Sequence, residues 1–79
     1  MNIVYVLRSD VDNKRYIGLT NNLERRINQH NSGKVKSTKS RIPFKLIYFE
    51  EFESRSEAAL REKFFKTGCG REFLKIIDK

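Results

Sequence analysis

Cysteine and histidine are nearly absent from this 79-residue sequence, which contains one residue of each type, Cys69 and His30. A single cysteine excludes an internal disulfide and a cysteine-rich zinc site, and it is typical of a reducing compartment. With one histidine the chain shows no Ser-His-Asp spacing, and it also lacks a glycine-rich phosphate-binding loop. We therefore expect neither acyl-transfer nor nucleoside-triphosphate chemistry.

Long hydrophobic runs are also missing. No apolar stretch approaches the roughly 20 residues that span a bilayer, and residues 1–8 are too short for a signal peptide. A chain of this length has room for one compact domain and buries only about 60% of the surface that its unfolded form exposes. We expect a single cytoplasmic domain over residues 1–79, with a thin core, no membrane partner and no small-molecule cofactor.

Positive charge is in excess, with 17 Lys and Arg against 10 Asp and Glu and a formal net charge of +7. Such an excess attracts polyanions, which favours a nucleic acid over the alternatives of a membrane surface or an acidic protein. The segment between Gly33 and Phe44 has no acidic residue and mixes cations with hydroxyls. This composition suits phosphate oxygens, although a solvated connection would share it. The basic residues of the segment are Lys34, Lys36, Lys39 and Arg41.

A β-hairpin is predicted at the start of the chain, where two segments of alternating branched and aromatic residues flank a polar stretch. A turn at the middle of that stretch would place Tyr5 opposite Tyr16 and Gly18 opposite Ile3. The two phenols would then share one face of the sheet, where they could form a site or a cross-strand pair that only stabilises the hairpin. The predicted strands cover residues 2–7 and 16–20.

A helix is predicted from Asn21, which would cap it, to Ser32. Its inward stripe includes Arg26 and His30, because residues three and four apart share a helix face. These two side chains need partners, since an unpaired buried polar group costs about 1 to 3 kcal/mol. A functional site would supply partners, and the alternative is that both side chains reach solvent at the rim. The stripe comprises Leu23, Arg26, Ile27 and His30.

The second half of the chain predicts one strand and two helices. Residues 44–49 form an almost unbroken apolar run, which suits a strand buried on both faces, the central or best-covered strand of the sheet. Ser54 opens a capping-box pattern for a helix to about Lys66, and glycines separate it from a last short helix over residues 71–77. The apolar residues expected on the core side of these helices are Ala58, Leu60, Phe64, Phe65, Phe73, Leu74, Ile76 and Ile77.

Several of these residues, in this order and spacing, resemble the GIY-YIG nuclease family. Val4-Tyr5-Val6 precedes Arg15-Tyr16-Ile17-Gly18, Arg26 and His30 follow on the predicted helix, and Glu62 stands where the family has its metal-binding glutamate. The resemblance covers nearly the whole chain and is nearest to the small stand-alone bacterial members. It implies an α/β (α+β) fold, with a small three-stranded antiparallel sheet flanked by helices. It also implies a metal-dependent endonuclease that hydrolyses DNA, structure-specific or nicking, in repair or recombination.

The resemblance implies a role for each side chain. Glu62 would bind one Mg²⁺ or Mn²⁺, with water and substrate phosphate as the other ligands. Arg26 would hold the scissile phosphate. Tyr5 or Tyr16 would orient or deprotonate the attacking water, for which a nearby cation would have to lower the phenol pKa from about 10. His30 would relay a proton or hydrogen-bond a phosphate oxygen.

This chain departs from the family pattern at three places. In the first motif, Ile3-Val4-Tyr5-Val6, the glycine and isoleucine of the family pattern are not both present in order, although only the tyrosine is expected to take part in the chemistry. Leu19 stands where excision-repair members have a lysine, which leaves Lys14 and Arg15 as the nearby basic residues. No asparagine follows Asn31, although many relatives use a downstream asparagine to position the substrate. The nucleic-acid contacts that we predict are Lys14, Arg15, Lys34, Lys36, Lys39 and Arg41.

We expect the DNA endonuclease to act as a monomer or weak dimer, with RNA as an alternative substrate. Two other functions are also compatible with the sequence. One is a nucleic-acid-binding module with weak or no catalysis. Another is a protein-interaction domain, which predicts no salt dependence of DNA binding. Glu50 and Glu51 are the alternative metal ligands, although acids at the end of a strand usually form a solvated edge.

Overall fold

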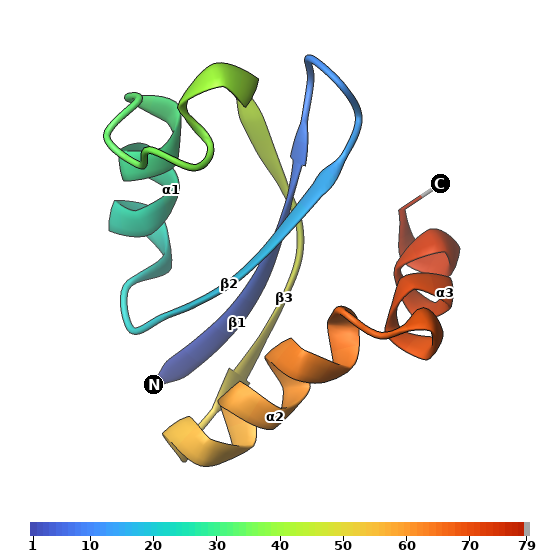
Figure 1. The fold of residues 1–79 in the computed structure, drawn as a ribbon. Coiled ribbons are helices and arrows are strands. Elements are labelled where there is room, and N and C mark those ends of the chain that lie inside the picture. The colour runs from blue at the N-terminus through green and yellow to red at the C-terminus, as the bar shows by residue number, and fades with distance from the viewer. Residues whose placement is uncertain (79) are drawn as a thin grey trace.

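The computed structural model describes residues 1–78 and shows a three-stranded antiparallel sheet with helices on both faces (Figure 1). The strand order is β2-β1-β3, so that β1 is central and the other two strands form the edges. The predicted α+β fold is confirmed. The elements are β1 (Asn2–Ser9), β2 (Arg15–Thr20), α1 (Leu23–Asn31), a 3₁₀ turn (Lys39–Arg41), β3 (Phe44–Phe52), α2 (Arg55–Phe65) and α3 (Gly68–Ile77).

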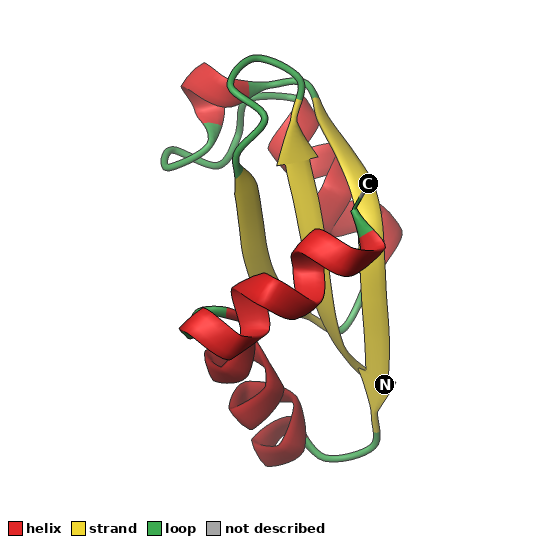
Figure 2. Ribbon diagram, turned by 90° about the vertical axis from the view of Figure 1, so that its right-hand side faces the viewer, coloured by secondary structure: helices red, strands yellow, loops and turns green. Residues whose placement is uncertain are grey.

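Each face of the sheet has its own hydrophobic core, because successive side chains of β1 point to opposite faces. Tyr5 and Leu7 pack with side chains of α1, whereas Val4 and Val6 pack with α2 and α3. These four β1 side chains are at most 1% exposed. Figure 2 shows α2 and α3 in front of the sheet and α1 behind it. Because burying one such side chain contributes about 1.5 to 3 kcal/mol, β1 stabilises both layers of the fold at once.

The prediction that residues 44–49 form the central or best-covered strand is wrong. In the described part of the chain, β3 pairs with β1 alone, and the side chains of Leu46 and Phe49 are 37% and 44% exposed. A β-bulge opposite Val6 and Leu7 shifts the register of β3. The apolar character of residues 44–49 is explained instead by the bulge. The strand changes register there, so its side chains contribute to both cores.

The hairpin register also differs from the prediction, by two residues. Tyr5 pairs with Gly18, and Tyr16 pairs with Leu7. The turn lies further along the chain than expected and contains Asn13 at a positive φ of 60°. A shift of two residues leaves every side chain on its own face, so the two phenols share a face as predicted.

The helix ends differ by a few residues from those predicted. Asn22 caps α1, one residue later than expected, whereas Ser54 caps α2 as predicted. Helix α3 begins at Gly68 rather than at residue 71, because the Thr67 hydroxyl accepts a hydrogen bond from the Gly70 N–H at 3.2 Å and caps this turn. The glycines that were expected to separate two helices thus form the first turn of α3. Among residues 1–78, no helix combines the length and apolarity needed to cross a membrane.

Three residues expected in the core are exposed, Leu60 at 69%, Ile76 at 67% and Ile77 at 38%. On α2 the inward position is taken by Arg61, whose guanidinium lies 4.5 Å from the ring centroid of Phe64. Arg61 also donates to Glu50 from Nε at 2.8 Å and from Nη2 at 3.1 Å. Burial alone would raise the pKa of Glu50, but the hydrogen bonds from Arg61 and Tyr48 and the charge of Arg61 together outweigh it and hold this pKa low. Glu50 is thus engaged by a cation of the protein, which argues against it as a metal ligand.

Gly70 provides a test of the packing between α2 and α3. A Cβ at this position would lie 2.0 Å from the carbonyl oxygen of Phe64, which is backbone and cannot move aside. We expect Gly70→Ala to lower the free energy of unfolding by about 2 kcal/mol, the scale that overpacking costs. Gly68→Ala is the matched control, because a Cβ there meets nothing within 4 Å. Urea unfolding of both variants checks this, and equal stabilities would contradict it.

Candidate functional site

A buried hydrogen-bonded network lies between the sheet and α1. The hydroxyl of Tyr5 is 2.9 Å from His30 Nε2 and accepts a hydrogen bond from Arg26 Nε at 3.3 Å. Tyr5 is 1% exposed and His30 is fully buried. Arg26 and His30 therefore point inward on α1 as the stripe predicted, and their partners are groups of the protein rather than bulk solvent.

The network continues from His30 into the basic segment. His30 Nδ1 lies 2.9 Å from the hydroxyl of Thr38, and that hydroxyl donates to the carbonyl of Val35 at 3.4 Å. Thr38 is fully buried, although it belongs to a segment of mostly exposed residues. The segment is thus attached to the network at its middle.

Hydrogen-bond counting assigns a direction to this network. If Thr38 donates to Val35, its oxygen accepts from His30 Nδ1–H, and the unprotonated Nε2 accepts from the Tyr5 hydroxyl. Every donor then has an acceptor. In the opposite direction, the Tyr5 oxygen would receive two donors while its own hydrogen lacked an acceptor. A buried unpaired donor costs about 1 to 3 kcal/mol, so the first direction is favoured.

Burial and Arg26 set the protonation states in the network. Burial raises the pKa of the Tyr5 phenol, and the hydrogen bond and charge of Arg26 only partly offset this. Burial, with the charge of Arg26 added, lowers the pKa of His30, which favours the neutral imidazole. The hydrogen bond to Tyr5 raises the pKa of Arg26 further, so this side chain keeps its charge. Tyr5 is therefore a neutral hydrogen-bonding group here, and the cation expected to lower its pKa is outweighed by burial.

Gly18 makes room for the ring of Tyr5 beside the backbone of β2. A Cβ at position 18 would lie 2.3 Å from the Tyr5 hydroxyl oxygen and 2.4 Å from the ring carbon that carries it. No side chain can be accommodated at that distance without moving the ring. The glycine of the Tyr16-Ile17-Gly18 motif is therefore needed for the position of the other tyrosine.

Tyr16 is the more accessible of the two phenols. It is half-buried, and its ring centroid lies 4.8 Å from that of His30 and 6.3 Å from that of Tyr5. Because β2 is an edge strand, Tyr16 lies where the two faces of the sheet meet. Four of the five predicted catalytic residues, Tyr5, Tyr16, Arg26 and His30, are thus brought together on the α1 side.

Glu62 comes from the opposite layer. It lies on α2, which packs on the other face of the sheet, but it lines the same cavity as Tyr16. This cavity has a volume of about 740 Å³ and opens along the edge strand, where Ile17 also lines it. The carboxylate therefore meets the phenol around the edge of the sheet, and not across one face.

The carboxylate of Glu62 fits a hard divalent ion that takes most of its ligands from elsewhere. Mg²⁺ commonly keeps several waters and binds one or two carboxylates together with substrate phosphate. The side chain of Glu62 is 26% exposed and pairs with Lys66 Nζ at 3.4 Å. Residues 1–78 contain no group of three or more His, Cys, Asp or Glu side chains that could surround an ion. An ion held here by Glu62 would need water and phosphate as its other ligands.

The predicted nucleic-acid contacts fall into two groups. Arg15 donates to Asp78 at 3.0 Å, and Arg41 donates to Asp12 at 3.1 Å, so both arginines are engaged within the protein. The lysines of the set are exposed on the surface, and they are Lys14, Lys34, Lys36 and Lys39.

Other cations near the site were not predicted from the sequence. Lys66 and Arg71 line the Glu62 cavity together with Lys14. Arg25 and Arg55 line a second cavity of about 280 Å³ with Arg26. Residues of α2 and α3 reach this side only through the tertiary fold, and helical periodicity contains no signal for that. Leu19, where the family resemblance led us to expect a lysine, packs against the α2 core.

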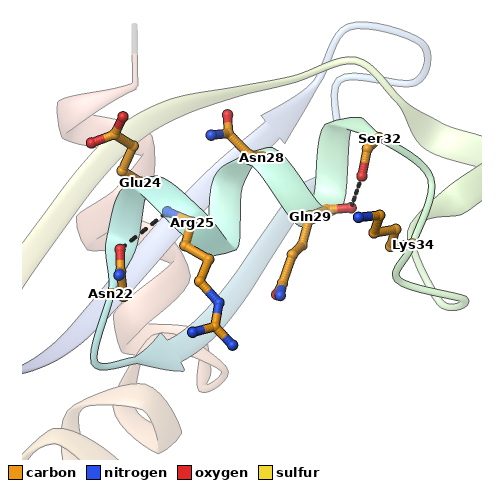
Figure 3. Close-up of a pocket in the computed structure, with 7 residues that line it drawn as sticks. All are labelled: Asn22, Glu24, Arg25, Asn28, Gln29, Ser32 and Lys34. Carbon is orange, nitrogen blue, oxygen red and sulfur yellow. Dashed lines mark hydrogen bonds between the residues drawn. The ribbon is translucent and has the colours of Figure 1, made fainter.

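A third cavity of about 540 Å³ follows the outer side of α1 (Figure 3). Amide side chains of Asn22, Asn28 and Gln29 line it, with Arg25 and Lys34 toward its two ends. It shares Asn22, Arg25 and Gln29 with the cavity that contains Arg26. The two cavities are therefore adjacent along α1 and lead toward the basic segment.

Comparisons with known proteins match this chain over nearly its full length. Residues 1–71 match the GIY-YIG catalytic domain family. A UPF0213 protein of Clostridium perfringens is 46% identical over 78 residues, which cover 98% of this chain and 83% of that protein. A UPF0213 protein of Staphylococcus haemolyticus is 46% identical over 77 residues, covering 96% and 93%. The solution NMR structure of a UPF0213 protein from Bacillus halodurans matches with a TM-score of 0.59 and 37% identity, covering 98% of this chain and 85% of that one.

The buried histidine predicts a pH dependence of stability. The pKa of His30 is lower in the folded protein than in the unfolded chain. The contribution of His30 to the free energy of unfolding is therefore complete above about pH 6.5, and it is lost as the pH falls through the folded pKa. We expect the free energy of unfolding to fall as the pH decreases below about 6.5. Denaturant titrations at several pH values check this, with His30→Asn as the variant in which the slope disappears. A stability independent of pH in this range would contradict the neutral assignment.

Proposed function

Because this chain belongs to the GIY-YIG family, with UPF0213 proteins as relatives, we propose that it is a metal-dependent endonuclease that hydrolyses DNA phosphodiester bonds. The observation that carries the proposal is the cavity shared by Tyr16 and Glu62, which lies beside the network that holds Arg26. One chain has one such set of side chains. We therefore propose that it nicks one strand in each binding event, in the course of DNA repair or recombination.

Arg26 is proposed to bind the scissile phosphate. Its Nε is held by Tyr5, and its Nη1 donates to Gln29 Oε1 at 3.1 Å. A guanidinium has five N–H donors in a planar fork, so donors remain for a phosphate in the cavity that Arg26 lines. Holding the fork in advance lowers the cost of ordering it when substrate binds.

Tyr16 is proposed to orient the attacking water, and Tyr5 to position Arg26. This division follows from burial, since Tyr5 is 1% exposed and a raised pKa keeps its proton in place, whereas Tyr16 lines the open cavity. A water placed between Tyr16 and a phosphate bound to Arg26 could contact both the phenol and the phosphate. His30 would keep Tyr5 in its orientation rather than act on the water itself.

Glu62 is proposed to hold the divalent ion, Mg²⁺ or Mn²⁺. When bound, such an ion supplies positive charge to the phosphate oxygens and lowers the pKa of bound water. Glu62 would contribute the protein's carboxylate, and Lys66, which now pairs with it, would be free to contact a phosphate instead. Lys66 is 57% exposed, so its pairing with Glu62 is weak and readily exchanged.

The cations around the site suggest how a DNA strand lies. Lys14, Lys66 and Arg71 line the Glu62 cavity together with Tyr16. Along α1, Arg25 lines two further cavities, one with Arg26 and the other with Glu24 and Lys34. A strand following these cavities would keep its phosphates near cations on both sides of the scissile bond.

The carboxylate gives the first test of this function. Glu62→Gln keeps the size of the side chain and removes its charge, and we expect it to abolish Mg²⁺-dependent nicking of supercoiled plasmid while DNA binding is nearly unchanged. Glu72→Gln on α3 is the control, because this carboxylate is 72% exposed and lies outside the cavity. Nicking by Glu62→Gln at the wild-type rate would contradict the metal site, and wild-type protein that binds DNA without nicking would favour a binding module.

The basic segment gives a second test. Replacing Lys34, Lys36 and Lys39 with alanine is expected to reduce the slope of log affinity against log salt by about 0.9 for each phosphate that the variant no longer neutralises. Binding at low salt should weaken while the turnover rate at saturating DNA stays near the wild-type value. Lys75→Ala on α3 is the control, since this lysine pairs with Glu72 away from the site. An unchanged salt slope would place the DNA on another surface.

A further inference from the structure

We propose that Thr38 is a positioning residue of the active site, which fixes the tautomer of His30 and thereby the orientation of Tyr5 and Arg26. The catalytic part of this inference rests on the proposed nuclease function, whereas the tautomer does not. Thr38 touches neither the phosphate nor the water in this scheme. It acts through His30.

The burial of Thr38 is the first observation. Its neighbours Lys36, Ser37, Lys39 and Ser40 are all exposed, yet Thr38 is fully buried with its hydroxyl on the imidazole. A segment that only displayed lysines would have no need to bury a hydroxyl, since burying a polar group is unfavourable unless it is paired. The pairing with His30 is the structural reason for its position.

The local backbone makes Thr38 an acceptor toward His30. The Thr38 N–H and the Thr38 hydroxyl both lie within hydrogen-bond distance of the carbonyl of Val35, at 3.1 and 3.4 Å. With its hydrogen directed to that carbonyl, the hydroxyl presents a lone pair to Nδ1. The Tyr5 hydroxyl, by contrast, can rotate to donate to Nε2 or to accept from it, although accepting would leave its own hydrogen without an acceptor. The fixed partner, Thr38, therefore decides which nitrogen of His30 carries the proton.

The tautomer determines what Tyr5 can do. With the proton on Nδ1, Nε2 accepts from the Tyr5 hydroxyl, and the lone pairs of Tyr5 remain available to Arg26 Nε. With the proton on Nε2, His30 and Arg26 would both donate to Tyr5, and the hydroxyl hydrogen of Tyr5 would have to leave the network. The guanidinium would then share the Tyr5 oxygen with the imidazole, and the buried Tyr5 hydrogen would lack an acceptor, so the contact that orients Arg26 would be weakened.

The single histidine makes the tautomer directly measurable. Imidazole nitrogen chemical shifts of isotope-labelled protein at about pH 8, where histidine is neutral, report which nitrogen is protonated. We expect the Nδ1–H form in the wild type and in Thr38→Ser, which keeps the hydroxyl. Thr38→Val has nearly the same shape without an acceptor, and we expect the Nε2–H form to become populated. An unchanged Nδ1–H form in Thr38→Val overturns the proposal.

Tyr5→Phe tests the same claim without altering Thr38. If Thr38 fixes the tautomer, His30 keeps Nδ1–H when its other partner is removed. A change to Nε2–H in Tyr5→Phe would show that Tyr5 sets the tautomer, and it overturns the proposal even if Thr38→Val fails to fold.

Kinetics then connect the tautomer to catalysis. We expect Thr38→Val to lower kcat about tenfold, the scale set by one buried hydrogen bond, with KM for DNA changed by less than about twofold. Thr38→Ser should retain kcat. A loss in Thr38→Val that appears only in KM would assign Thr38 to DNA binding and overturn the positioning role. Wild-type protein that never nicks contradicts the proposed function, and the tautomer measurements still decide the role of Thr38.

Discussion

The hydrogen bond between the Tyr5 hydroxyl and His30 Nε2 joins the central strand to the first helix in a region closed to water. Both groups are buried and have lost their hydrogen bonds to water, so each would be left unpaired without the other. Gly18 allows the ring of Tyr5 to lie beside the neighbouring strand, and Arg26 and Thr38 complete the hydrogen-bonding capacity of the pair. The position of the guanidinium proposed to bind phosphate, and that of the basic segment, both depend on this contact.

Charge is distributed unevenly between the inside and the outside of the site. Inside, burial keeps Tyr5 protonated and His30 neutral, so Arg26 is the charged member of the network. Outside, lysines and arginines line the cavities that contain Glu62 and Arg26, in which Glu62 is the one carboxylate among the described lining residues. In the proposed mechanism, the outer cations attract a polyanion, whereas the neutral inner groups set the geometry. Separate residues would thus attract the nucleic acid and orient the reacting groups.

Periodicity and capping predicted the hairpin, the helices and the stripe that brings Arg26 and His30 inward, because these features depend on local spacing. Hairpin register and the identity of the central strand depend on a turn containing Asn13 and on tertiary pairing, which local patterns do not contain. For the same reason the sequence could name Glu62 only through a family resemblance, since its helix covers the opposite face of the sheet. Thr38 could not be predicted at all, because a hydroxyl among lysines is ordinarily solvated.

The division of the site between two layers has a consequence for its dynamics. Phenols and guanidinium are held by the α1 core, whereas the carboxylate is carried by a helix anchored in the other core. Local opening of α2 would separate Glu62, the proposed metal ligand, from the rest while the buried network stayed intact. For the proposed nuclease, catalytic competence is therefore a stricter condition than being folded. The fraction of molecules able to react at any instant would depend on how tightly α2 stays packed on the sheet.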